Sequence, residues 1–155
     1  MSNVASRLPG AEAPWAGHGP ARRGRIGLAS NQQRELILVV DDDASIRSTV
    51  EDILVIEGYD VETASGGASA ITQIRSRRPA LVLLDMRMHG VDGWTVAREV
   101  RSFAPEVPIV VMTAAEDAAR WAQEIGANGY LAKPFLLDEL VTCVRRFIRR
   151  TSRDN

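Results

Sequence analysis

Cysteine, lysine and aromatic residues are scarce in this chain of 155 residues. Cys143 is the one cysteine, which excludes an internal disulfide and is typical of proteins in a reducing compartment. The longest apolar runs have the length of a single strand, so the sequence predicts no transmembrane helix. The N-terminal region also lacks the continuous apolar segment of a secretory signal peptide. We therefore expect a cytoplasmic protein that is not bound to a membrane.

Charge is distributed unevenly along the chain, although the formal net charge is only −1. Residues 35–144 carry 18 acidic and nine basic side chains, whereas residues 1–34 and 145–155 each carry five arginines and a single acidic residue. Basic termini can contact nucleic acid, but no aromatic-interleaved patch or helix-turn-helix pattern accompanies these arginines. We expect no direct DNA binding. We interpret residues 1–33, which are rich in Gly, Ala, Pro, Arg and Ser, as a disordered basic extension.

Apolar runs of strand length alternate with helical patterns from residue 35 onwards. Five such pairs predict a parallel sheet with helices on both faces, an α/β fold of the doubly wound, flavodoxin-like (βα)5 type. The common order for five strands is 2-1-3-4-5. The predicted strands are 36–40, 60–63, 81–84, 108–112 and 129–132. The predicted helices are 44–57, 66–77, 93–102, 115–125 and 136–149. These elements define a domain over residues 34–150, followed by a tail at 151–155.

Acidic residues follow directly after two of the predicted strands. In LILVVDDD the first strand runs into Asp41 and Asp42, and in LVLLDMRM the third strand runs into Asp85. The order 2-1-3-4-5 makes strands 1 and 3 neighbours, so these three carboxylates converge at one edge of the sheet. Carboxylates held this close repel one another, and a bound proton or a divalent cation relieves the repulsion. Oxygen ligands in a partly open cleft suit Mg²⁺, so we predict a magnesium site here.

Thr113 and Lys133 end the fourth and fifth strands at the same edge. Lys133 is the one lysine beside 18 arginines, and a compact ammonium group can enter a cramped site that a guanidinium group cannot. The same edge of the predicted sheet therefore holds a cation site, a carboxylate nucleophile, a hydroxyl group and an ammonium group. These groups are what the transfer of a phosphoryl group to a carboxylate requires.

Four stretches, taken together, resemble the motifs of bacterial response regulator receiver domains: LILVVDDD, LVLLDMRMHGVDG, VPIVVMTA and GANGYLAKPF. The resemblance covers about residues 35–150. It implies that Asp85 is the phosphorylated aspartate and that Asp42 binds Mg²⁺ directly. It further implies that Asp41 holds a metal-bound water and that Arg87 offers its backbone carbonyl to the metal.

The same resemblance implies a conformational switch after phosphorylation. Thr113 and Lys133 would bind phosphoryl oxygens, and the bond from Lys133 to Pro134 would be cis. Tyr130 would turn inward when the Thr113 hydroxyl moves towards the phosphate. The surface formed by the fourth helix, the fifth strand and the fifth helix would then change shape and control a partner.

The expected protein is a stand-alone receiver, because only a few residues follow the last predicted helix. A histidine kinase or a histidine phosphotransfer protein would donate the phosphoryl group, and a downstream protein of unknown identity would respond. Such a domain is not an enzyme for other substrates, since it catalyses only its own phosphorylation and dephosphorylation. Arg87 and Ala115 stand where this family tunes hydrolysis, and they favour slow self-dephosphorylation. A half-life of seconds for the phosphorylated protein would contradict that.

The last two predicted helices present a wide apolar surface. We expect Leu137 to be buried and Trp121, Cys143 and Phe147 to be partly exposed. This surface is explained equally well by internal packing and by a face for a partner or a homodimer. We expect Cys143 to be an inert helix residue rather than a redox sensor.

Two other functions fit parts of the pattern. A Mg²⁺-dependent phosphatase of the haloacid dehalogenase type needs a second acid two residues after its nucleophile, where this chain has Arg87. A receiver that binds its partner without phosphorylation would lack an essential Asp, Thr or Lys, and none is missing. Asp43 is expected to be a solvated acid or the cap of the first helix, with contact to the metal as the less favoured alternative. Asp92 is expected to form the turn and cap that open the third helix. His89 is expected as an exposed loop residue, with a pH-sensitive group near the site as the alternative.

Overall fold

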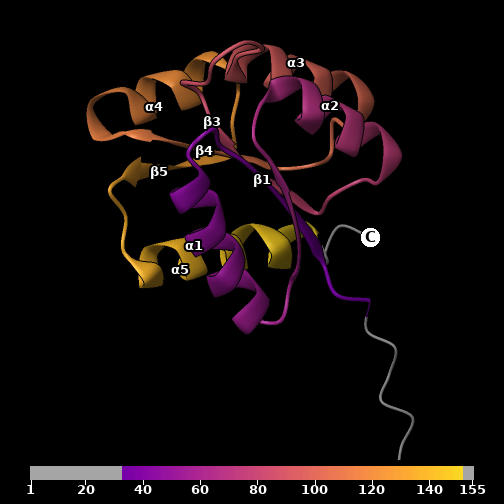
Figure 1. The fold of residues 1–155 in the computed structure, drawn as a ribbon, viewed down its shortest axis with the longest axis vertical. Coiled ribbons are helices and arrows are strands. Elements are labelled where there is room, and N and C mark those ends of the chain that lie inside the picture. Colours follow the sequence, from indigo (N-terminus) through magenta and orange to yellow (C-terminus); the bar gives the residue numbers. More distant parts are fainter. Residues whose placement is uncertain (1–32, 152–155) are drawn as a thin grey trace, which may run out of the picture. The chain divides into compact units, whose positions relative to one another are not determined.

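The computed structural model describes residues 33–151. The extension expected at the N-terminus therefore lies outside the described residues except for its last position, and the expected C-terminal tail does so except for Thr151. Within the described residues, five strands alternate with five helices (Figure 1). The strands are β1 Leu36–Val40, β2 Asp60–Ala64, β3 Leu81–Asp85, β4 Ile109–Ala114 and β5 Gly129–Lys133. The helices are α1 Ala44–Ile56, α2 Gly67–Ser76, α3 Gly93–Phe103, α4 Ala115–Glu124 and α5 Leu137–Thr151.

The strands form one parallel sheet in the order β2-β1-β3-β4-β5, which confirms the predicted fold class and strand order. β1 lies directly beside β3, with Val40 opposite Leu84. β4 follows on the other side of β3, with Met112 opposite Asp85. The carboxyl ends of these strands therefore meet at one edge of the sheet, where a switch in strand order leaves room for a site.

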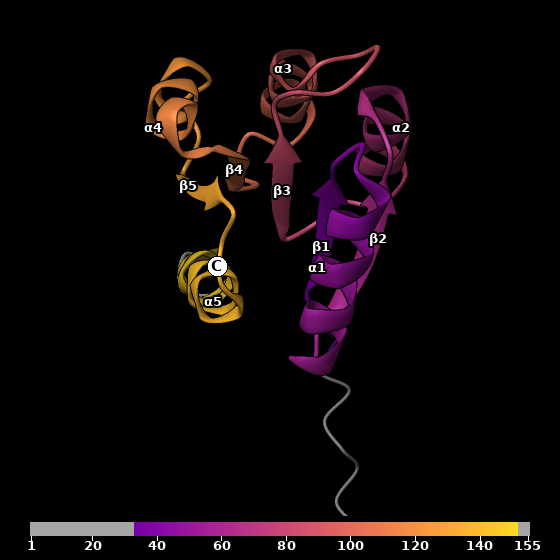
Figure 2. The same cartoon turned by 60° about the vertical axis from the view of Figure 1, so that its left-hand side comes forward.

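Apolar side chains cover both faces of the sheet, because β1 is apolar throughout and β3 and β4 are apolar except for Asp85 and Thr113 near their carboxyl ends. One face packs against α1 and α5, and the other packs against α2, α3 and α4, as Figure 2 shows. Successive residues alternate between the two layers: Val39 belongs to the first and Val40 to the second. None of the described helices is both long and apolar enough to cross a bilayer.

Two aspartates begin helices, as the sequence predicts. The Asp43 carboxylate accepts hydrogen bonds from the amides of Ser45 and Ile46 at the start of α1. The Asp92 carboxylate accepts one from the amide of Thr95 at the start of α3. Both carboxylates are committed to helix capping, so neither belongs to the acidic cluster at the sheet edge.

The predicted exposure of two aromatic side chains is wrong. Trp121 is 7% exposed and meets the ring of Trp94 from α3 edge-on, with 5.1 Å between the ring centroids. Phe147 is 5% exposed because it lies against Gly129 of β5, where a Cβ atom would stand 2.8 Å from the phenyl ring. Leu137, predicted to be buried, is 54% exposed, since the buried stripe of α5 starts one turn later. That stripe comprises Leu140, Val141, Val144, Phe147 and Ile148.

Candidate phosphoacceptor and metal site

Three carboxylates gather at the carboxyl edge of the sheet, as the strand order predicts. Asp41 and Asp42 follow β1, and Asp85 is the last residue of β3. One carboxylate oxygen from each of the three lies within 4.8 Å of the others. Asp41 and Asp85 are buried, whereas Asp42 is half-buried at the mouth of the cluster.

Asp85 is a buried acid whose proton is held more tightly than usual. Burial raises the pKa of Asp85 above 3.8, and the nearby charges of Asp41 and Asp42 raise it further. Two groups oppose this rise in pKa. The amide of Arg87 donates to Asp85 Oδ1 at 3.0 Å, and the positive charge of Lys133 favours the ionised form. The ionised Asp85 carboxylate has therefore lost most of its contact with water, but the amide of Arg87 and the charge of Lys133 still stabilise it. A carboxylate in such surroundings suits the role of a nucleophile.

Lys133 joins the acidic cluster from the end of β5. Its Nζ lies 2.6 Å from Asp41 Oδ2 and 3.5 Å from Asp85 Oδ2. The other oxygen of Asp41 accepts a hydrogen bond from the amide of Asp43 at 2.9 Å. Fully buried Asp41 is therefore partnered on both oxygens, and Lys133 is shared unequally between two acids. The bond from Lys133 to Pro134 is cis, as predicted.

Asp42 has a partner that the sequence does not reveal. His89, in the loop after β3, places its ring Nδ1 2.8 Å from Asp42 Oδ2 and its amide 3.3 Å from the same oxygen. The ring hydrogen bond is the main reason why the pKa of Asp42 lies below 3.8. The ring itself is fully exposed, as expected for a loop residue. The contact depends on how the loop folds back, which no periodic pattern encodes.

The donor set of the acidic cluster fits a hard divalent cation. The three acids supply carboxylate oxygens as ligands. The ammonium group of Lys133 can offset only one of their three negative charges, so a bound cation would balance the remaining charge. Mg²⁺ prefers such oxygen ligands and leaves positions open for water or phosphate. When bound, Mg²⁺ would offset the charge of the acids and of an incoming phosphoryl group.

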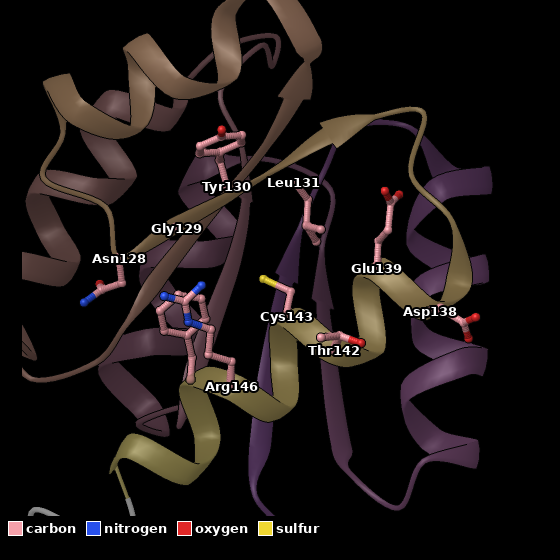
Figure 3. Close-up of a pocket in the computed structure, with 10 residues that line it drawn as sticks. Asn128, Gly129, Tyr130, Leu131, Asp138, Glu139, Thr142, Cys143 and Arg146 are labelled. Atoms are coloured by element: carbon pink, nitrogen blue, oxygen red, sulfur yellow. The ribbon is translucent and has the colours of Figure 1, made fainter.

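Thr113 and Tyr130 lie on adjacent strands near the same edge. Thr113 follows Met112, the residue opposite Asp85, and is 2% exposed. It pairs with Ala132, while Tyr130 pairs with Val111, so both side chains face the α4 side of the sheet. Tyr130 is 51% exposed and points away from α5, on the opposite side of β5 from Leu131 (Figure 3).

A shallow surface pocket lies between β5 and α5. Figure 3 shows Cys143 at its centre, with Asp138 and Glu139 towards one end and Arg146 towards the other. Cys143 is half-buried, and burial raises the pKa of its thiol to about 11. The thiol therefore stays protonated at neutral pH, in line with the expected inert role.

The side chain of Arg87 leaves the acidic cluster and binds α4. Its guanidinium forms an ion pair with Asp117 and lies over the ring of Trp121, 4.9 Å from the centroid. Arg120 also pairs with Asp117, at 3.0 Å. The sequence predicted a metal contact for the backbone of Arg87 and an influence of its side chain on hydrolysis, but no contact with α4. The acidic partner lies 30 positions away, and no sequence signal connects the two.

Comparison with known proteins places these features in a family. The family model of the response regulator receiver domain matches residues 37–145. Response regulator MprA from Mycobacterium sp. strain KMS is 42% identical over 120 residues, which are 76% of this chain and 52% of the relative. MprA from Mycobacterium avium strain 104 is 41% identical over 117 residues, or 74% and 51% of the two chains. The chain thus spans about half the length of these curated relatives.

Solved structures of similar fold include receiver and chemotaxis proteins. The receiver domain of NtrX from Brucella abortus is 36% identical, with a TM-score of 0.69, and the match covers 73% of this chain and 98% of that one. The chemotaxis protein CheY4 from Vibrio cholerae is 30% identical, with a TM-score of 0.68, and the match covers 74% and 98%.

Proposed function

Because this chain belongs to the response regulator receiver domain family, whose members are phosphoacceptors in two-component signalling, we propose that Asp85 is its phosphorylated residue. Receivers take phosphoryl groups from histidine kinases and bind Mg²⁺ at an acidic pocket. The position of Asp85 supports the assignment: it ends a central strand, it is buried, and it lies among two further acids and a lysine.

In the proposed transfer, a carboxylate oxygen of Asp85 attacks the phosphorus of a phosphohistidine. The P–N bond breaks as the O–P bond forms, and the donor imidazole leaves with the electron pair. Asp85 becomes an acyl phosphate. The amide of Arg87, which donates to Oδ1, keeps the carboxylate oriented during the attack.

We assign the magnesium ligands to Asp41, Asp42, Asp85 and the backbone carbonyl of Arg87. Asp42 and Asp85 would bind the ion directly, and Asp41 would act through a bound water. The pairing of Asp41 with Lys133 at 2.6 Å supports this division, because that carboxylate already has a cationic partner. The half-exposed position of Asp42 suits a ligand that the ion reaches first.

Thr113 and Lys133 are the proposed partners of the phosphoryl group. Lys133 Nζ lies 3.5 Å from Asp85 Oδ2, so a short movement away from Asp41 would pair it with a phosphoryl oxygen. In β4, Met112 lies opposite Asp85, and Thr113 is the next residue. Its hydroxyl would donate to another phosphoryl oxygen.

The output of phosphorylation would be a change in the α4–β5–α5 surface. Tyr130 is 51% exposed and faces the same side of the sheet as buried Thr113. Movement of Thr113 towards the phosphate would open space that Tyr130 can enter, which biases a two-state equilibrium. A downstream protein, or a second copy of this chain, would read that change. Of the residues predicted for this face, Cys143 remains accessible, whereas Trp121 and Phe147 are buried beneath it.

The observation that carries this proposal is the cluster of three acids and one lysine around the end of β3. Beryllofluoride mimics a phosphoryl group on a carboxylate and tests the proposal without a kinase. Fluorine NMR should detect beryllofluoride bound to the wild-type protein in Mg²⁺, and neither to Asp85→Asn nor to the wild type in EDTA. Equal binding to Asp85→Asn would overturn the assignment of the acceptor.

A further inference from the structure

Arg87 connects the loop after the proposed phosphorylation site to helix α4. Its backbone amide donates to Asp85 Oδ1 at 3.0 Å, while its guanidinium pairs with Asp117 in the first turn of α4. The same guanidinium lies 4.9 Å from the centroid of the Trp121 ring, one turn further along that helix. One residue therefore contacts the acceptor through its backbone and α4 through its side chain.

The α4 end of this connection is partly buried and tightly packed. The Asp117 side chain is only 12% exposed, whereas that of Arg87 is 63% exposed, so solvent screens this ion pair mainly from the side of Arg87. Trp121 is held in place by Trp94 of α3. Arg120 supplies a second partner for Asp117 at 3.0 Å and a second cation over Trp121 at 5.9 Å. We call the contacts of Arg87 with Asp117 and Trp121 the α4 latch.

The start of α4 is joined directly to the end of β4, so a movement of β4 also moves the first turn of α4. The helix begins at the residue after β4 ends, with no connecting loop. Its N-cap position is Ala114, whose methyl group cannot accept a hydrogen bond from the first turn. Thr113 immediately precedes that position. A shift of Thr113 therefore pulls on the first turn of α4, which the latch holds through Asp117.

We propose that the α4 latch holds α4 in the arrangement of the unphosphorylated protein, and that phosphorylation of Asp85 opens it by drawing Arg87 away from Asp117. The inference rests on the proposed function and adds a regulatory role for Arg87. A phosphoryl group carries up to about two negative charges and three acceptor oxygens, so it competes with one carboxylate for the guanidinium.

The opening of the latch leaves no buried charge without a partner. Asp117 keeps Arg120 at 3.0 Å, and Trp121 keeps the same residue over its ring. An uncompensated buried carboxylate would make the change costly, whereas the second arginine keeps the two arrangements close in free energy. Such balance is what a two-state element requires.

The coupling between latch and phosphorylation site is reciprocal, which gives a direct test. Asp117→Asn breaks the ion pair but frees Arg87 to meet the phosphoryl mimic, so it should bind beryllofluoride in Mg²⁺ about three- to tenfold more tightly than wild type. In an Arg87→Met background the same substitution should change the affinity less than about twofold. Arg98→Met, an exposed arginine on α3, is the matched control and should leave the affinity unchanged.

Tryptophan emission gives a second readout of the latch. In a Trp15→Phe background the remaining indoles are Trp121, which belongs to the latch, and Trp94, which packs against it. Beryllofluoride should change their emission in this background and not when Arg87→Met is added. If Asp117→Asn does not fold, Arg87→Lys takes its place. This variant keeps the positive charge but loses the planar group over the indole of Trp121. It should therefore also bind beryllofluoride more tightly than wild type.

The failure of the latch is distinguishable from the failure of the proposed function. If wild type binds beryllofluoride while Asp117→Asn binds with unchanged or lower affinity, the latch is wrong and the phosphoacceptor assignment stands. An equal gain from Asp117→Asn in the Arg87→Met background would also overturn the latch. If folded wild type binds no beryllofluoride in Mg²⁺, the proposed function itself fails.

Discussion

Lys133 is the residue that offsets the charge of the buried acids in this site. Asp41 is fully buried, and Lys133 is its cationic partner at 2.6 Å. The chain uses arginine at every other basic position, yet this position is cramped: the lysine side chain is only 20% exposed. A buried pair of this kind contributes little net stability when intact, but the loss of one member leaves an uncompensated charge.

Lys133→Met should therefore lower the free energy of unfolding by about 3 kcal/mol in EDTA. Mg²⁺ should restore part of the loss, because a bound cation would offset the charge of Asp41. Urea unfolding followed by circular dichroism measures both effects. Arg145→Met breaks the exposed pair of α5 with Glu57 and serves as control, with an expected loss of at most about 1 kcal/mol. Equal losses for the two variants would contradict the structural role given to Lys133.

Asp85 makes a second prediction at this scale, and its sign follows from its pKa. Burial raises the pKa in the folded state, so the folded protein binds this proton more tightly than the unfolded chain does. Ionised Asp85 therefore costs stability above its folded-state pKa. The cost diminishes as the pH falls through that pKa and disappears below 3.8, where both states are protonated.

Asp85→Asn removes that charge and keeps the shape of the side chain. In EDTA at pH 7 the variant should be more stable than wild type, by an amount of the order of 1 kcal/mol. The difference should shrink as the pH falls through the folded-state pKa of Asp85. Urea unfolding of both proteins across this range, always compared at the same pH, gives the measurement. A variant that is less stable than wild type at pH 7 would show that ionised Asp85 is stabilised by its neighbours.

Arg101 acts at the scale of elements, because it ties two loops together at the amino edge of the sheet. From the last turn of α3 it donates to the carbonyl of Val107 before β4 and to the carbonyl of Gly126 after α4. It also donates to Asn128 Oδ1, which accepts a further hydrogen bond from the amide of Ile109 in β4. One guanidinium thus fixes the entries to β4 and β5.

Arg101→Ala should lower the free energy of unfolding by about 2 kcal/mol, since it removes several hydrogen bonds at once and leaves the partly buried carbonyl of Val107 without this donor. Arg98→Ala, on the exposed side of the same helix, should change it by less than about 0.5 kcal/mol. Urea unfolding of the two variants measures the difference. If Arg101→Ala were as stable as Arg98→Ala, these hydrogen bonds would contribute nothing to the fold.

The elements themselves were predictable wherever a local signal defines them. Uninterrupted apolar runs located β1 correctly and β3 to within one residue, since Asp85 also belongs to that strand. Asp43 and Asp92 stand directly before the starts of α1 and α3. β4 begins one residue later than predicted and runs two residues further, to Ala114. The side chains of α4 and α5 were harder to place. Periodicity does not reveal that Trp121 meets Trp94, or that the missing side chain of Gly129 makes room for Phe147.

At the scale of the whole molecule, topology explains why much of the site was predictable. The strand order alone makes β1 and β3 neighbours, so the acids at their carboxyl ends converge. Contacts that depend on the loop after β3 were missed, because its conformation decides them. His89 turns back to Asp42, and Arg87 reaches across to Asp117. Neither contact has a periodic or motif signal in the sequence.

The central claim is that this domain receives a phosphoryl group on Asp85 with the help of Mg²⁺. The most direct test is the intact mass of the full chain after incubation with acetyl phosphate, a small phosphoryl donor, in Mg²⁺. We predict one added phosphoryl group on wild type, and none on Asp85→Asn or on wild type in EDTA. A folded wild type that gains no mass and binds no beryllofluoride, or an Asp85→Asn variant that gains the same mass, would contradict the account.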